Sequence, residues 1–210
     1  MKKLVLLLSL LVILTGCTVV RIDTSNIDTI VDVVLSKNNT LYNTVGKGYK
    51  YYKPRGVSYI DTNEYNEKLY SNGNYYYLYV DTNSYFYKKE FEYKENKSAY
   101  YSRYLDINDK KGYLEINKDG DYYFIQYMYN YAKVEAKVLE SDINDCILDA
   151  TYILSTIKYN GNVIKLVLNE DYFTNKESIY DIFTPKEVTS DFLEYKDDIE
   201  SGDDTDGTIR

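Results

Sequence analysis

The chain has 210 residues, a formal net charge of −8 and no histidine. Its length suits one domain with a sizeable core. The absence of histidine excludes Ser-His-Asp and Cys-His nucleophile systems within the chain and removes the commonest zinc ligand. An acidic chain without a local Lys/Arg cluster repels phosphate backbones, so we expect no nucleic-acid partner.

The amino-terminal segment has the features of an export signal. Two lysines follow Met1, and an apolar run extends from Leu4 to Leu14. This run is too short to span a bilayer comfortably and is typical of a secretory signal. Residues 14–17, Leu-Thr-Gly-Cys, resemble the lipobox of bacterial lipoproteins. The resemblance implies that a diacylglyceryl group alkylates the Cys17 thiol and that cleavage removes residues 1–16; the alternative is an uncleaved membrane helix through Val20.

Lipidation at Cys17 has consequences for location and for cysteine chemistry. Two acyl chains give stable anchoring, at about 0.8 kcal/mol per buried methylene. We therefore predict a lipid-anchored protein on the extracytoplasmic face of the cell membrane, with residues 17–24 as lipidated cysteine and tether. Cys146 is then left without a partner for an intramolecular disulfide. It lies on an apolar helix face and is predicted to be a buried small hydrophobe rather than a nucleophile.

Two amphipathic helices are predicted, one near each end of the domain. Ser25 is the expected N-cap of a helix over residues 26–37, whose apolar side chains repeat at helical spacing. Ser141 is the expected N-cap of a helix over 142–157, and Asn160-Gly161 is its expected stop signal. The second helix carries an apolar stripe that includes Ile153 and needs a sheet to cover it.

The region between these helices is predicted to be an antiparallel meander. Asn72-Gly73 favours a tight hairpin turn. Residues 122–138 form the central hairpin: the second half alternates apolar and charged residues, whereas the first half is apolar or aromatic on both faces. Periodicity leaves 100–107 open between strand and short helix, and it leaves 163–168 undetermined. The remaining predicted strands cover residues 46–52, 57–61, 64–70, 75–81, 84–93 and 113–117.

These elements define an α+β fold class: a single antiparallel Tyr-rich β-sheet packed by an N-terminal and a C-terminal amphipathic helix. We expect one domain over residues 25–193 and an acidic, disordered tail over 194–210. The pattern Gly-Tyr-x-Tyr-Tyr-x-Pro-Arg-Gly at 48–56 and Ile-Leu-Ser-Thr-Ile-Lys at 153–158 are similar to PsbP-like domains. That resemblance implies a non-catalytic assembly or binding role, which is an analogy from fold.

No motif predicts a catalytic, cofactor or metal site. Asp106 to Gly112 fails the EF-hand pattern, because Lys110 stands where an oxygen ligand is needed and Lys111 where glycine is needed. The acidic stretch 203–207 ends before a closing glutamate. Glu90 and Glu92, expected on one strand face, are interpreted as solvated surface rather than as a general acid and base.

The sequence therefore predicts a lipid-anchored, non-catalytic binding or assembly module of the bacterial envelope. Its expected partners are the membrane, through the lipid on Cys17, and an envelope protein or a glycan. One alternative is a surface module that binds a glycan or a peptide through exposed tyrosines; another is a carboxylate-based hydrolase. The 28 tyrosines reflect either an A/T-rich genome or an aromatic binding surface. The ligand and the oligomeric state are left undecided.

Overall fold

The computed structural model describes residues 23–63 and 66–171. Cys17, the export signal and the acidic tail over 194–210 lie outside the described residues. Within them, mixed α+β structure with mostly antiparallel strands is confirmed.

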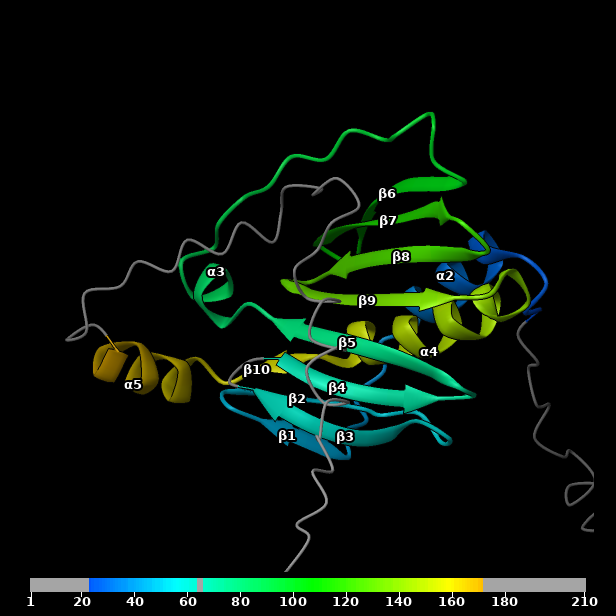
Figure 1. The fold of residues 1–210 in the computed structure, drawn as a ribbon. Helices are drawn as coiled ribbons and strands as arrows, with labels where there is room; N and C mark the ends of the chain where they lie inside the picture. The colour runs from blue at the N-terminus through cyan, green and yellow to red at the C-terminus, as the bar shows by residue number, and fades with distance from the viewer. Residues whose placement is uncertain (1–22, 64–65, 172–210) are drawn as a thin grey trace, which may run out of the picture.

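The strands form two antiparallel sheets (Figure 1). The large sheet has seven strands in the order β3-β4-β5-β9-β8-β7-β6, and the small sheet has three in the order β1-β2-β10. The prediction of a single sheet is therefore wrong. Within the predicted strand 46–52, Gly46 ends β1, and Tyr49 and Lys50 of β2 pair with β10. The large sheet comprises β3 (Ser58–Asn63), β4 (Asn66–Ser71), β5 (Asn74–Val80), β6 (Tyr101–Ile107), β7 (Lys110–Asp119), β8 (Tyr122–Tyr129) and β9 (Ala132–Val138). The small sheet comprises β1 (Thr44–Gly46), β2 (Tyr49–Tyr51) and β10 (Lys158–Tyr159).

The helix boundaries differ from those predicted because other side chains make the caps. The helices are α2 (Ile27–Leu35), α3 (Thr82–Phe86), the 3-10 turn η1 (Glu140–Asp142), α4 (Ile143–Thr156) and α5 (Gly161–Asp171). Asn26, not Ser25, accepts the backbone N–H of Thr29. Ser141 lies within η1 and makes no cap. Asn160 begins α5 by accepting the N–H of Val163, so 163–168 is helical.

The central hairpin is formed by β8 and β9, which are inner strands of the large sheet. As its apolar pattern predicts, β8 is buried on both faces: Phe124 and Met128 lie on the face opposite Tyr127, and all three are buried. Asn130 and Tyr131, which join the two strands, both have positive φ angles near 55°.

One hydrophobic core contains side chains of both main helices and of the large sheet. Ile30 and Val31 of α2, Cys146 and Ile153 of α4, and Val134 of β9 belong to the same buried cluster. Figure 1 shows α2 and α4 on one side of the large sheet. The two sheets are also joined by a polar contact, because the buried Glu67 of β4 accepts hydrogen bonds from the hydroxyls of Tyr49 and Tyr51 of β2.

The predicted strand over 84–93 is wrong. The buried Asp81 accepts the N–H of Ser84 and starts the short helix α3 instead. The chain then continues as an irregular segment, residues 87–99, which we call the strap and which leads to the edge strand β6 (Figure 1). Glu95 of the strap accepts the backbone N–H of Tyr104 at 2.9 Å, so the strap is fastened to that edge.

Gly112 of β7 lies where backbones approach closely, and replacing it with alanine is expected to destabilise the fold. A Cβ there would clash with the carbonyl oxygen of Met128 and would lie 2.8 Å from the Tyr129 Cα. Overpacking of this kind costs about 1–3 kcal/mol of unfolding free energy. Urea denaturation of Gly112→Ala should show this loss. Gly161→Ala is the matched control, since nothing lies within 4 Å of that site, and it should leave stability unchanged or slightly higher.

Candidate functional site

The tyrosines have two different environments. Many are core residues, and the fully buried ones include Tyr51, Tyr76, Tyr113, Tyr127 and Tyr129. The exposed ones are Tyr42, Tyr59, Tyr70, Tyr87, Tyr100 and Tyr122, which come from separate elements. Much of the tyrosine content among the described residues therefore fills the interior, so richness in tyrosine by itself does not define a binding surface.

Polar residues line up across the sheet face that carries Phe124 and Met128. Strand register places Ser102, Glu115, Gln126, Glu135, Tyr77 and Lys68 in one row across six neighbouring strands. Glu115, Gln126 and Glu135 are buried. Two carboxylates thus lie two strands apart in this row, roughly 9.5 Å in strand spacing, which is the kind of arrangement a carboxylate-based hydrolase needs.

The hydrogen bonds of Glu115 give it a structural role. Its Oε2 accepts the hydroxyl of Tyr93, and its Oε1 accepts the amides of Asn96 at 3.1 Å and Asn117 at 2.9 Å. The Tyr93 ring also stacks on Tyr113, with centroids 4.4 Å apart. Tyr93 and Asn96 belong to the strap, so Glu115 anchors the strap to the sheet.

Glu135, the second carboxylate of the row, is also engaged. Its Oε1 accepts the ammonium of Lys133 at 2.6 Å and the amide of Gln126 at 3.2 Å. Only 5% of Glu115 and 3% of Glu135 is exposed. The row is therefore a packed polar layer. Its two carboxylates are buried and hydrogen-bonded within the protein, so they are not accessible to a substrate in this conformation.

A more accessible arrangement lies at the end of the β7–β8 hairpin. We call it the hairpin-end cluster and define it by Tyr100, Tyr122, Tyr123, Leu139 and Glu140. Tyr122 and Tyr123 begin β8, and Tyr123 pairs with Val138, the residue before Leu139. The ring of Tyr100 meets that of Tyr123 edge to face, with centroids 4.7 Å apart. Three of the five side chains are large and exposed: Tyr100 at 52%, Tyr122 at 45% and Leu139 at 46%.

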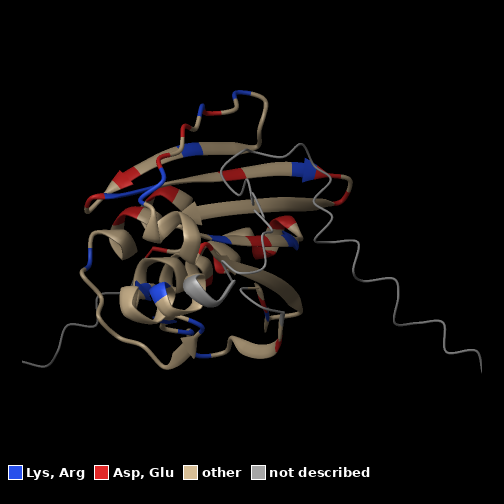
Figure 2. Ribbon diagram, turned by 90° about the vertical axis from the view of Figure 1, so that its left-hand side faces the viewer, with Lys and Arg blue, Asp and Glu red and all other residues tan. Residues whose placement is uncertain are grey.

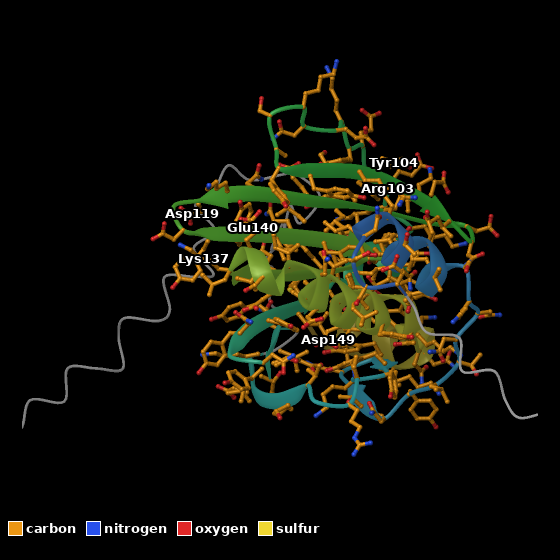
Figure 3. All side chains as sticks on the ribbon, turned by 90° about the vertical axis from the view of Figure 1, so that its right-hand side faces the viewer. Arg103, Tyr104, Asp119, Lys137, Glu140 and Asp149 are labelled. Carbon is orange, nitrogen blue, oxygen red and sulfur yellow. The ribbon has the colours of Figure 1, made fainter. Side chains whose placement is uncertain are left out.

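The electrostatics of the cluster centre on Glu140. Desolvation raises the pKa of Tyr100 and of Tyr123, and the nearby carboxylate of Glu140 raises both pKa values further. Both phenols are therefore kept neutral beside one carboxylate. Figure 3 shows Glu140 on the same side of the molecule as Asp119 and Lys137.

The lysines near the cluster are already engaged. Lys137 binds Asp119 with an N–O distance of 2.7 Å, and its ammonium lies 5.6 Å from the Tyr122 ring centroid. Lys118 lies 5.8 Å from the Tyr123 centroid. The cluster thus offers exposed aromatic rings beside a carboxylate, a combination suited to binding cationic groups or hydroxylated ligands.

The residues considered from sequence are spread over the molecule. Glu90 and Glu92 are exposed on the strap rather than on a strand face, so that part of the prediction is wrong. Figure 2 shows both acidic and basic residues along the loop at the top of the molecule. Asp106 to Gly112 includes the β6–β7 turn, where Asn108 and Asp109 have positive φ. Cys146 is buried as predicted, and burial raises the pKa of its thiol. Cys17 and 203–207 lie outside the described residues.

Sequence reasoning missed the hairpin-end cluster because strand register creates it. Tyr100 lies between the strap and β6, Tyr123 belongs to β8 and Glu140 belongs to η1. No spacing rule connects these three positions. The sequence Lys118-Asp119-Gly120-Asp121 indicates a turn and so locates the end of the hairpin. It does not indicate which side chains meet there.

Two further observations concern sites and relatives. Over residues 23–63 and 66–171, no group of three or more His, Cys, Asp or Glu residues is arranged to hold a metal ion. In the same ranges, none of the helices has the length and apolar character needed to cross a membrane. Comparison of the chain with models of known protein families and with curated proteins finds no match.

Proposed function

We propose that this chain is a lipid-anchored, non-catalytic binding or assembly module on the extracytoplasmic face of a bacterial membrane. The anchor is the diacylglyceryl group on Cys17, which the lipobox-like tetrad before it supports. The globular part is an antiparallel sheet with α2 and α4 covering one face, as the shared core of these elements supports.

The hairpin-end cluster is the observation that carries the binding role. Protein interfaces are enriched in tyrosine, and their central residues are large aromatic anchors beside polar groups. Tyr100, Tyr122 and Leu139 provide exposed apolar area, and Glu140 provides a hydrogen-bond acceptor beside it. An envelope protein is therefore the partner that we favour.

Glycan binding is the second candidate, and one specific observation supports it. The exposed rings of Tyr100 and Tyr122 lie near carboxylates, Glu140 and Asp119 respectively. Aromatic faces stack on sugar rings and carboxylates accept sugar hydroxyls. A hydrolase finds less support, since Glu115 and Glu135 are buried and engaged by neighbouring side chains.

The anchor would hold the domain close to the bilayer. Residues 18–24 separate Cys17 from the beginning of the domain, and an extended chain spans at most about 3.5 Å per residue. The start of α2, ten residues after Cys17, would then remain within roughly 35 Å of the lipid headgroups. A partner of such a module would be a component of the same membrane or of the adjacent wall.

Replacing Cys17 with serine is expected to release the protein from the membrane. In the wild type, intact-mass measurement of the membrane-extracted chain should show loss of residues 1–16 and added mass on Cys17. Cys17→Ser cannot accept the thioether-linked lipid, so it should appear in the aqueous fraction or remain uncleaved without added lipid. Cys146→Ser is the matched control and should fractionate like the wild type. A wild-type chain that retains residues 1–16 or carries an unmodified Cys17 would contradict the anchor.

A further inference from the structure

Glu140 has no basic partner within the described part of the chain. The ion pairs there join Arg103 to Asp28 and Asp32, Lys133 to Glu135, and Lys137 to Asp119. Glu140 is exposed, and the groups that its charge affects are the two neutral phenols of Tyr100 and Tyr123. Its carboxylate therefore takes part in no ion pair with a described lysine or arginine.

The ring of Tyr100 is likewise without a cation among the described residues, although other tyrosines of this protein have one. Lys50 lies 3.8 Å from the Tyr42 ring centroid, and Lys68 lies 4.5 Å from that of Tyr75. An ammonium over a tyrosine face is attracted by the ring quadrupole. The exposed ring of Tyr100 lies close to Glu140. Together they offer a lysine ammonium both a cation–ring contact and an opposite charge.

The remaining features of the cluster fit a long basic side chain. Leu139 is 46% exposed and adjoins Glu140, so it offers apolar surface along which the methylene stem of a lysine can lie. The chain as a whole carries a net charge of −8, which attracts basic partners over a longer range. A neutral sugar would gain nothing from the charge of Glu140 or from the net charge of the chain.

We propose that Tyr100, Tyr123, Leu139 and Glu140 form a docking point for a lysine side chain in a basic segment of a partner protein. This inference rests on the proposed binding function and specifies the chemistry of the partner. The ammonium lies over the Tyr100 ring and donates to the Glu140 carboxylate, while the stem contacts Leu139. Tyr123 supports the Tyr100 ring edge to face and holds its orientation.

The test uses the full-length chain in neutral detergent micelles, with acetyl-tetralysine amide as the probe. Titration is followed by ring resonances of labelled tyrosines and by calorimetry. We expect binding that shifts the Tyr100 and Tyr123 resonances. Glu140→Gln, which removes one exposed charge and keeps the ring, should weaken it roughly fivefold. Tyr100→Leu should weaken binding similarly, whereas Tyr100→Phe, which keeps the ring, should retain it.

Glu92→Gln is the matched control, because it removes the same charge from an exposed position on the strap. It should leave tetralysine binding within about twofold of the wild type. Equal weakening by Glu92→Gln and Glu140→Gln would mean diffuse attraction to an acidic surface and would overturn the docking point. Absence of tetralysine binding would overturn it too. Chitohexaose is the neutral probe: if it binds at Tyr100 and tetralysine does not, the cluster is a glycan site.

Failure of the lysine site can be separated from failure of the proposed function. Membrane attachment through Cys17 is measured by mass and fractionation, and neither readout depends on Glu140. If the chain is lipidated but binds no tetralysine, the anchored-module proposal stands and only the lysine site is refuted. A chain that binds tetralysine but is not lipidated would keep the lysine site and lose the anchor.

Discussion

Raising the pH above about 10 is expected to unfold this protein cooperatively. Tyr51, Tyr76, Tyr113 and Tyr127 are at most 1% exposed, and burial raises the pKa of each phenol above the ordinary value of 10.0. Each phenol stays protonated in the fold and ionises first in the unfolded chain. Its stabilising contribution is therefore complete below pH 10 and is lost as the pH rises from there towards the pKa of the folded state.

The size of this effect follows from the number of protons released. Each tyrosine that ionises only on unfolding lowers the unfolding free energy by about 1.4 kcal/mol per pH unit. The four together give roughly 5–6 kcal/mol per pH unit, comparable to the whole stability of a small domain. Absorbance of tyrosinate and far-UV circular dichroism should be recorded together from pH 8 to 12.5. The part of the absorbance that comes from the buried tyrosines should change in one joint transition with the circular dichroism signal.

A conservative variant checks the origin of the alkaline transition. The Tyr113 hydroxyl is buried and has no hydrogen-bond partner among the described residues. Tyr113→Phe should therefore match or exceed wild-type stability at pH 7 and should make the alkaline transition less steep by about one proton. Gradual tyrosinate formation up to pH 12, with an unchanged circular dichroism signal, would contradict the account.

Ile153→Asp is expected to abolish folding at neutral pH. Ile153 of α4 is completely buried in the cluster that joins both main helices to the large sheet. The variant loses the apolar contacts of isoleucine, about 2–5 kcal/mol, and must also bury an unpaired carboxylate or keep it protonated. The combined cost is on the order of the total stability of a domain of this size. Circular dichroism and thermal melting would report an unfolded chain.

Asn144→Asp controls for the added charge, since residue 144 of α4 is only half-buried and near the start of the helix. A negative charge at that end of the helix is favourable. The control should melt within a few degrees of the wild type. Wild-type melting of Ile153→Asp would mean that α4 does not cover the sheet.

Elements that depend only on neighbouring residues could be predicted from the sequence. The alternation in 132–138 identified β9, the two-sided apolar run identified β8, and Asn72-Gly73 identified the β4–β5 turn. Each depends on neighbouring residues alone. The predicted strand over 84–93 failed because the cap at Asp81 starts α3, and the residues that follow contact partners on β6 and β7.

Features that depend on register were not predictable. Nothing local shows that β2 pairs with β10, which lies more than a hundred residues later in the sequence. The same applies to the hairpin-end cluster, which joins Tyr100, just before β6, to the beginning of β8 and to Leu139 and Glu140. The acidic pair Glu90/Glu92 is exposed, in line with its interpretation as solvated surface, although it lies on the strap and not on a strand.

The order of strands in the large sheet also determines how the chain can reach this fold. The β6–β7–β8–β9 meander consists of adjacent hairpins, and β3–β4–β5 is a second local unit. In the large sheet the two units meet where β5 pairs with β9, from Tyr76–Ala136 to Val80–Ala132, and α3, the strap and three strands lie between these two strands in the sequence. Closing so long a loop costs chain entropy before the β5–β9 contacts can stabilise it. We therefore expect this pairing to form late and the protein to fold more slowly than a simple meander. During folding, the inner edges of β5 and β9 would therefore stay exposed until these two strands pair.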